Sequence, residues 1–247
     1  MNALAKTKVM INLIKLFVLT IRRKNSDEDY FLFQKYQASI VVENIINTFK
    51  CNNSMTVMDY GCGQGGYSKV LTKYFNKVVA IDYHILPVSH NDSNIEYVVA
   101  DLLNYKREPV DIVFCASVIE HIDSPKQGKL IKQIADNTRQ GGYLYLSFPP
   151  FNSPIGGHAC APFHYLPDKL ALFLTNTVKR YPIKSYETMY GDWGLYRTNI
   201  EEVNRLLVIH GFEILTIKSR YMPNWYSNFF KHNNFLNWNA EFYCRKL

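Results

Sequence analysis

The stretch that decides the fold reads Thr56-Val57-Met58-Asp59-Tyr60-Gly61-Cys62-Gly63-Gln64-Gly65-Gly66. Its first five residues predict a short buried strand, and the glycines predict a tight turn into a helix. Such a turn lets a ligand approach the backbone closely, beside the N–H groups at the start of the helix. Gly61, Gly63 and Gly66 also satisfy the dinucleotide-binding pattern G-x-G-x-x-G, so the turn alone does not choose the ligand.

Asp59 separates the two kinds of ligand. In a dinucleotide site a pyrophosphate lies over the glycines, where a buried acid at this position would repel it. A carboxylate suits a ligand with a cationic amino group instead. Asp82 follows the next predicted strand, near the ~20-residue offset expected of an acid that binds ribose. We therefore expect a ligand with an amino-acid group and a ribose but no phosphate.

Short apolar segments alternate with helical patterns around this stretch. Strands are predicted at residues 56–60, 77–81, 94–100, 111–115, 143–147, 212–218 and 242–244. The alternation predicts an α/β fold with a parallel sheet covered on both faces. Ser124 is expected to open the helix after residues 111–115, and Gly141 to lie just past its end. Thr198 and Glu201 form a predicted capping box for a later helix.

Composition agrees with a globular chain. The 247 residues are 47% apolar, which excludes a disordered tail, and 28 Lys+Arg against 21 Asp+Glu give a net charge of +7. The excess of positive charge indicates an anionic partner without saying which. The five cysteines are scattered and never spaced as C-x-x-C. That pattern disfavours a disulfide framework and is typical of proteins in the reducing cytoplasm. It also disfavours a zinc site, so no metal is expected.

Four segments in register resemble the motifs of class I S-adenosylmethionine-dependent methyltransferases of the type 11-like kind. Residues 57–66 resemble the first motif, 79–83 the second, 100–102 the third and 111–122 the fourth. The resemblance covers roughly residues 55–148 and 198–247. It implies a Rossmann-like, doubly wound, seven-stranded, mostly parallel sheet with an antiparallel last strand.

The same resemblance implies S-adenosylmethionine as cofactor and names its binding residues. They are Asp59, Gly61, Cys62, Gly63, Gly65, Asp82, Tyr83, Asp101, Leu102 and Ser117. Asp59 would orient the methionyl ammonium group through the loop, Asp82 would hold both ribose hydroxyls, and Asp101 would accept from the adenine amino group. Ser117 would lie near the sulfonium.

Residues 149–197 form an expected insertion, or lid, between the core segments 51–148 and 198–247. The insertion holds six of the ten prolines and the sequence Ser153-Pro154-Ile155-Gly156-Gly157-His158. This arrangement resembles a subset of methyltransferases found with glycan-assembly enzymes. Because a neutral histidine can remove a hydroxyl proton, His158 is the first candidate catalytic base and His164 the second. Either histidine could instead only bond a loop carbonyl.

The first 50 residues are expected to be helical, with an amphipathic helix at 8–22. Polar residues of this helix form one narrow stripe, and the rest of its surface is apolar. Two interpretations stand equal: a helix that lies on the inner face of the membrane, using residues 8–24, or one that covers the protein's own sheet. No apolar run reaches the ~20 residues needed to span a bilayer.

The sequence thus predicts a methyltransferase that acts on a small-molecule acceptor, with a hydroxyl of a sugar, glycolipid or polar-lipid precursor as the leading candidate. An RNA or protein methyltransferase is the alternative, although nucleic acid is disfavoured because no RNA-binding module is apparent. A non-catalytic or NAD-binding Rossmann protein is the second alternative. The oligomeric state is left open.

Overall fold

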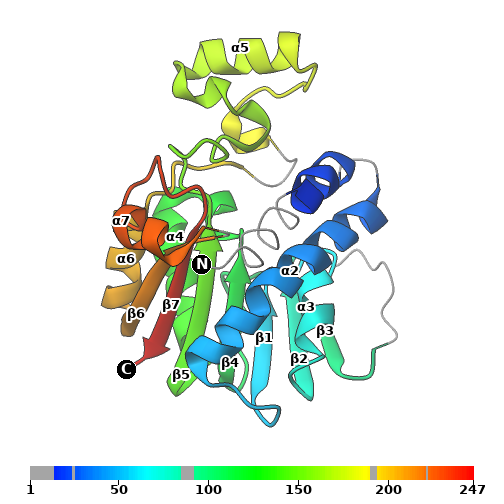
Figure 1. Cartoon of the computed structure of the whole chain (residues 1–247), viewed down its shortest axis with the longest axis vertical. Coiled ribbons are helices and arrows are strands. Elements are labelled where there is room, and N and C mark those ends of the chain that lie inside the picture. The colour runs from blue at the N-terminus through cyan, green and yellow to red at the C-terminus, as the bar shows by residue number, and fades with distance from the viewer. Residues whose placement is uncertain (1–13, 24–25, 85–91, 190–193, 221) are drawn as a thin grey trace. The chain divides into compact units, whose positions relative to one another are not determined.

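The computed structural model describes residues 14–23, 26–84, 92–189, 194–220 and 222–247. Its strands form a seven-stranded sheet in the order β3-β2-β1-β4-β5-β7-β6 (Figure 1). The strands are β1 (Thr56–Tyr60), β2 (Lys77–Asp82), β3 (Ile95–Val99), β4 (Val110–Ala116), β5 (Thr138–Phe148), β6 (Phe212–Ser219) and β7 (Ala240–Lys246). β1 pairs in parallel with β2 and β4, β2 with β3, and β7 runs antiparallel to β6. The predicted doubly wound α/β fold with an antiparallel last strand is confirmed.

Among the described residues, helices lie between most of the consecutive strands along the chain. They are α2 (Asp27–Phe49), α3 (Gly66–Leu71), α4 (Ser124–Asp136), α5 (Asp168–Val178), α6 (Ile200–Ile209) and α7 (Asn224–Phe230). Four short 3₁₀ turns join them: η1 (Ile119–His121), η2 (His158–Cys160), η3 (Phe163–Tyr165) and η4 (Tyr186–Thr188). The chain divides into two compact units: unit 1 holds residues 1–115 and 137–143, and unit 2 holds 116–136 and 144–247. The expected division into N-terminal helices, core and insertion stays a prediction.

Unit 1 is built on the parallel strands β1, β2 and β3. Val57, Met58 and Tyr60 of β1 are all buried, as expected for a strand covered on both faces. α2 begins at Ser26, whose hydroxyl accepts the backbone N–H of Asp29 at 3.1 Å. α2 and α3 lie on the same side of these strands (Figure 1). Their contact fixes the start of α3, and with it the glycine turn.

Unit 2 is held by a buried polar network around Arg220, which is 3% exposed. The Arg220 guanidinium donates to Glu241 of β7 at 3.1 Å and to the Tyr145 hydroxyl of β5 at 3.0 Å. Tyr145 donates in turn to Glu241 at 2.5 Å. Pairing of this kind is what lets a charged side chain remain in a core. The network joins β5, β7 and the end of β6.

A smaller apolar cluster of unit 2 lies under α5, which stands apart from β6 and β7 (Figure 1). Its buried members are Phe151, Cys160, Ile183, Met189 and Leu195. All five come from the segment expected to be an insertion. The cluster gives that segment a core of its own, and this core carries the η2 turn.

Two helix boundaries differ from expectation. α4 ends at Asp136, and Gly141 lies inside β5 with φ 73° rather than at the end of the helix. The cap of α6 is Asn199, whose side chain accepts the Glu202 N–H at 2.8 Å, and not Thr198. The Thr198 hydroxyl accepts from Gln127 at 2.9 Å. Asparagine is at least as good a cap as threonine, so the helix starts one residue later.

Residues 14–22 of the expected helix 8–22 are helical, and its first residues, 8–13, lie outside the described residues. Leu16 is buried, the Lys15 ammonium lies 4.5 Å from the centre of the Tyr36 ring, and Arg22 pairs with Asp29 at 3.0 Å. The segment therefore packs on α2 through part of its basic stripe. Among the described helices, none is long and apolar enough to cross a membrane.

Candidate functional site

The glycine turn after β1 has a backbone that other residues adopt with difficulty. Gly61, Gly63 and Gly65 have φ values of 86°, 54° and 77°. Gly61 and Cys62 both donate to the carbonyl of Ile81 in β2, at 2.8 and 3.0 Å. The turn is therefore held at the carboxyl ends of two neighbouring parallel strands. This edge is where open α/β sheets bind their ligands.

Asp82 ends β2 and faces the same turn. Its Oδ2 accepts the Gly63 N–H at 2.8 Å, and its Oδ1 accepts the His84 N–H at 3.2 Å. The side chain is 8% exposed, and burial raises the pKa of its carboxyl. Asp82 thus fixes the loop in addition to the expected ribose role, which stays a prediction.

Asp59 lies within β1 and is 2% exposed. Its Oδ2 accepts the Ser68 hydroxyl of α3 at 2.5 Å. Burial raises the pKa of Asp59 to about 7. A cationic group brought close to this carboxylate would be stabilised and would lower that pKa again. The environment thus suits the ammonium group that the sequence predicts.

Gln34 of α2 is a loop-holding residue that the sequence analysis missed. Its Nε2 donates to the carbonyl of Cys62 at 3.4 Å, and its Oε1 accepts the Gly66 N–H at 3.3 Å. Gly66 lies so close to α2 that a Cβ there would be 2.5 Å from the Gln34 Cβ. The sequence around residue 34 carries no motif that marks this contact.

Asp101 and Leu102 follow β3 at the same edge of unit 1. The Asp101 carboxylate accepts the Leu103 N–H at 2.9 Å and the Asn104 amide, so it braces its own turn. The carbonyl of Leu102 accepts the Tyr60 hydroxyl. Tyr83 is 55% exposed, and its ring contacts that of His84. The structure thus brings the predicted unit 1 residues to one edge, while their individual contacts with cofactor stay predictions.

Unit 2 holds a second group of polar residues, just after β4. Ser117 has φ 58° and donates its N–H to the Ser147 carbonyl at 2.8 Å; its predicted cofactor role stays a prediction. Glu120 in η1 is 1% exposed, and burial raises the pKa of its carboxyl to about 8. The His158 Nε2 lies 3.9 Å from its Oε1. The His121 ring lies 5.1 Å from that of His158, centre to centre.

These three side chains form the group we call the Glu120 cluster: Glu120, His121 and His158. Each offers one potential ligand atom, and those atoms all lie within 4.8 Å of one another. His158 itself has φ 49°, a conformation that non-glycine residues adopt at a cost. The predicted first base therefore lies beside a buried acid that the sequence analysis did not assign to the site.

His164, the second candidate base, is 3% exposed. Its Nε2 lies 3.1 Å from the Ser153 carbonyl, and its ring packs edge-on to Phe151 at 5.5 Å. Burial lowers its pKa. A Cβ at Gly157 would clash with the same ring, so this glycine lets the η2 turn approach it. These contacts fit a role in shaping the loop, and the catalytic role of His164 stays a prediction.

Unit 2 has a small pocket of about 110 Å³ beside Phe151. Its lining is Phe151, Asn152, Arg197, Thr198, Asn199 and Asn234. The Arg197 guanidinium lies 4.8 Å from the centre of the Phe151 ring. An aromatic face beside amide and guanidinium groups is suited to a small polar molecule.

The model of a family described as a methyltransferase domain matches residues 32–217, most of the chain. The chain belongs to this methyltransferase family. Its cofactor is S-adenosylmethionine, and the match spans the glycine turn, Asp82 and the Glu120 cluster.

Curated proteins that are similar to this chain, at low sequence identity, are also methyltransferases. The chain is 23% identical over 100 residues to phosphoethanolamine N-methyltransferase 3 of Arabidopsis thaliana, covering 36% of this chain and 20% of the relative. It is 27% identical over 116 residues to an uncharacterised methyltransferase of Mycobacterium sp. (strain KMS), covering 45% of each. The chain thus spans between a fifth and just under half of these curated relatives.

Solved structures show the same fold. The N-methyltransferase NodS of Bradyrhizobium japonicum WM9, in complex with S-adenosyl-l-homocysteine, superposes with a TM-score of 0.50 at 11% identity, covering 85% of each chain. A putative S-adenosylmethionine-dependent methyltransferase from Listeria monocytogenes gives 0.53 at 14% identity, covering 85% of this chain and 98% of the other. At these identities the likeness concerns the fold alone.

Proposed function

We propose that this methyltransferase acts on a hydroxyl group of a sugar, glycolipid or polar-lipid precursor. The methyl carbon would pass from the sulfonium of S-adenosylmethionine to the acceptor oxygen. The electrons of the broken C–S bond stay on sulfur, which leaves S-adenosylhomocysteine, and the hydroxyl proton departs. The sulfonium is already a strong electrophile, so the protein's tasks are alignment and removal of that proton.

The Glu120 cluster is the observation that carries this proposal. A hydroxyl is a weak nucleophile until its proton is lost, so an oxygen acceptor needs groups that promote that loss. Side chains able to promote proton loss gather around His158, which fits an oxygen acceptor. The polar and aromatic lining of the pocket beside Phe151 supports a sugar-like acceptor as well. We accordingly assign to His158, as part of the Glu120 cluster, the promotion of hydroxyl proton loss.

The proposal is tested with the full chain and S-adenosylmethionine that carries a deuterated methyl group. Candidate acceptors are monosaccharides, glycolipids, phosphoethanolamine and RNA, and products are identified by mass spectrometry. A deuteromethyl ether on a sugar or lipid hydroxyl is the expected product. Transfer to the amine of phosphoethanolamine, or to RNA, with no ether formed would overturn the proposal.

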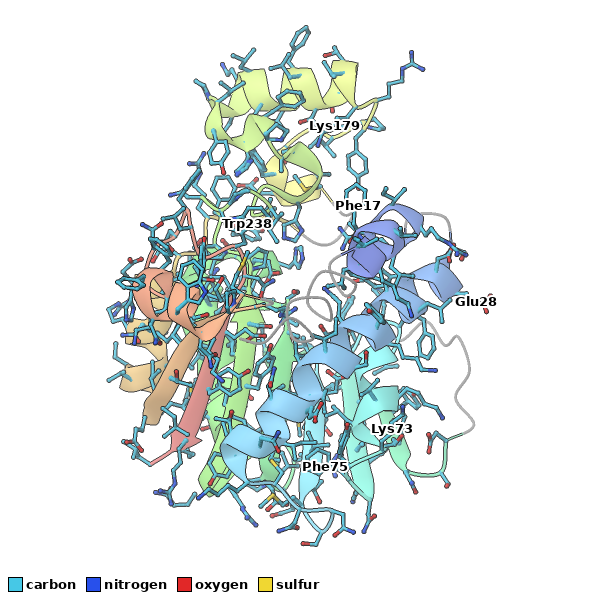
Figure 2. The ribbon with its side chains drawn as sticks, viewed as in Figure 1. Phe17, Glu28, Lys73, Phe75, Lys179 and Trp238 are labelled. Carbon is cyan, nitrogen blue, oxygen red and sulfur yellow. The ribbon has the colours of Figure 1, made fainter. Side chains whose placement is uncertain are left out.

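We further propose that helix 14–22 rests on an anionic membrane surface. Four apolar side chains recur on one of its faces, and all are exposed: Ile14, Phe17, Val18 and Ile21, at 60%, 67%, 48% and 60%. Phe17 is labelled in Figure 2. This face does not include Lys15 and Arg22, whose side chains contact α2. An apolar face on a chain of net charge +7 fits the surface of an anionic bilayer.

Co-sedimentation with vesicles that contain anionic lipid tests this second proposal. Phe17→Ser should reduce the bound fraction, and Phe229→Ser should not, although Phe229 is even more exposed at 80%. Equal binding by both variants and the unchanged chain would refute membrane contact through this helix.

A further inference from the structure

The Glu120 carboxylate occupies an unusual environment. The side chain is 1% exposed, and among the described residues neither of its oxygens has a hydrogen-bond partner of ordinary geometry. The Ser117 side chain and the Arg220 guanidinium lie near enough to oppose in part the rise in its pKa that burial causes. A buried carboxylate in this state is costly unless a positive group compensates it. The nitrogen that approaches it is Nε2 of His158, at 3.9 Å, which exceeds the length of a hydrogen bond.

His121 is arranged as a metal-binding histidine would be. Its Nδ1 lies 2.8 Å from the carbonyl of Gly194, so Nδ1 carries the proton and donates. The lone pair then lies on Nε2, on the opposite side of the ring. A histidine that binds a metal through one nitrogen commonly donates from the other to a backbone carbonyl, which fixes its tautomer and orientation. Burial also lowers the pKa of His121 and keeps the ring neutral.

The three ligand atoms are close enough to share one ion. They lie within 4.8 Å of one another. In a tetrahedral zinc site with bonds of about 2.0–2.1 Å, neighbouring ligand atoms lie about 3.3–3.4 Å apart. The 3.9 Å between Glu120 Oε1 and His158 Nε2 would have to contract by roughly half an ångström, and the widest of the three separations by up to roughly 1.4 Å, through side-chain rotation.

We propose that Glu120, His121 and His158 bind one Zn²⁺ ion. Two imidazoles favour a transition metal over Mg²⁺ or Ca²⁺, and two histidines with one glutamate form a ligand set known for catalytic zinc. Three protein ligands leave a coordination position open. The sequence analysis expected no metal, because no cysteine pair has zinc spacing and Ser117 stands where a further acid would be needed beside Glu120. In the structure the third potential ligand comes from His158, far from Glu120 along the chain.

The zinc site would supply the proton loss that the proposed methyl transfer requires, and its catalytic role rests on that proposed function. In the open position, Zn²⁺ would bind the acceptor hydroxyl oxygen and lower its pKa, so that the proton passes to solvent water. His158 would then act as a ligand through the ion rather than as the free base expected from the sequence. The turn that carries His158 explains the placement, since its positive φ aims the ring at Glu120.

The site is tested by calorimetric titration of the untagged, metal-free full chain with Zn²⁺, in the absence of cofactor and acceptor. One Zn²⁺ per chain is expected. Glu120→Gln, His121→Asn and His158→Asn should each weaken binding by more than about 10-fold, the effect that losing even an outer-shell partner has. The exposed His232 provides the matched control, and His232→Asn should bind Zn²⁺ as the unchanged chain does.

Substitution of Co²⁺ for Zn²⁺ gives a spectroscopic signal that a folded chain without bound metal does not produce. Bound Co²⁺ should give the visible absorption of a four- or five-coordinate ion, and each cluster variant should lose it while circular dichroism shows a folded chain. Binding that is absent, or that survives unchanged in all three variants, overturns the zinc site. Because no methyl transfer is measured here, this result is independent of the proposed function, which would fail only in the acceptor experiment.

Discussion

Replacement of Gly66 by alanine tests how closely the glycine turn and α2 are packed. A Cβ at this position would lie 2.5 Å from the Gln34 Cβ and 2.7 Å from both the Lys35 nitrogen and the Phe31 carbonyl oxygen. Two of these three atoms belong to the α2 backbone and cannot rotate away. α2 would have to move by roughly 1 Å, a case of overpacking that costs about 1–3 kcal/mol.

The expected loss in stability is measurable. For a chain of this size, each kcal/mol lowers the melting temperature by about 2–4 °C, so Gly66→Ala should melt about 2–12 °C lower. The displaced turn also loses the hydrogen bond from Gly66 N–H to Gln34. We therefore expect weaker binding of S-adenosylmethionine, by about 10-fold, which is the size of one hydrogen bond of about 1.4 kcal/mol.

Gly128→Ala is the matched control. Gly128 lies inside α4, and a Cβ there would meet only the Leu206 Cδ2 at 3.4 Å, an ordinary contact. Because alanine is the better helix former, this variant should be about 0.5–1 kcal/mol more stable. Thermal melting and calorimetric titration with cofactor are the assays. A Gly66→Ala variant that melts and binds as the unchanged chain does would refute the packing argument.

Three further predictions concern the carboxylates and the histidine. Asp82→Ala removes the acceptor of the Gly63 N–H and the expected ribose ligand, so calorimetry should show cofactor binding weakened by about 10- to 100-fold; unchanged affinity would contradict the role. The pKa of Asp59 is about 7 in the folded chain against an ordinary 3.8, so the protonated acid is favoured by folding. Stability from this group is therefore greatest below about pH 4 and declines as pH rises to about 7, and Asp59→Asn should abolish that decline, on the order of 4 kcal/mol at most. Because the cofactor ammonium prefers the ionised carboxylate, affinity should also rise between pH 6 and 8, and equal pH profiles for variant and unchanged chain would argue against it. His158→Ala should lower turnover by about 100-fold or more while cofactor affinity stays within 2-fold, and the control His232→Ala should change neither. Comparable turnover in both variants would contradict the role assigned to His158.

Much of the fold could be predicted because its signals are local. A buried strand such as Thr56–Tyr60 is a run of neighbouring apolar residues, and the turn after it is marked by consecutive glycines. Asp82 and Asp101 were found for the same reason, since each directly follows a strand. The helix caps show the limit. Thr198 and Asn199 both carry suitable side chains, and the sequence does not say which one the neighbouring Gln127 will engage.

The parts of the site that escaped prediction depend on contacts between distant residues. Gln34 reaches the glycine turn from a helix that precedes it, and nothing near residue 34 marks that contact. Glu120 was seen as part of a family motif, yet its significance comes from full burial beside His158. Burial of a single acid has no signature in sequence, because acids are almost always exposed.

Lys179, labelled in Figure 2, sets a practical limit on redesign of α5. Its ammonium donates to the carbonyls of Ala159 and Ala161, on either side of Cys160. These hydrogen bonds attach the C-terminal end of α5 to the loop that begins at His158. A library that alters the exposed Leu170 and Phe173 can change the outer surface of α5 and leave the hydrogen bonds of Lys179 intact. Randomising position 179 would mix changes in acceptor scope with plain loss of loop geometry, so the lysine is best held constant.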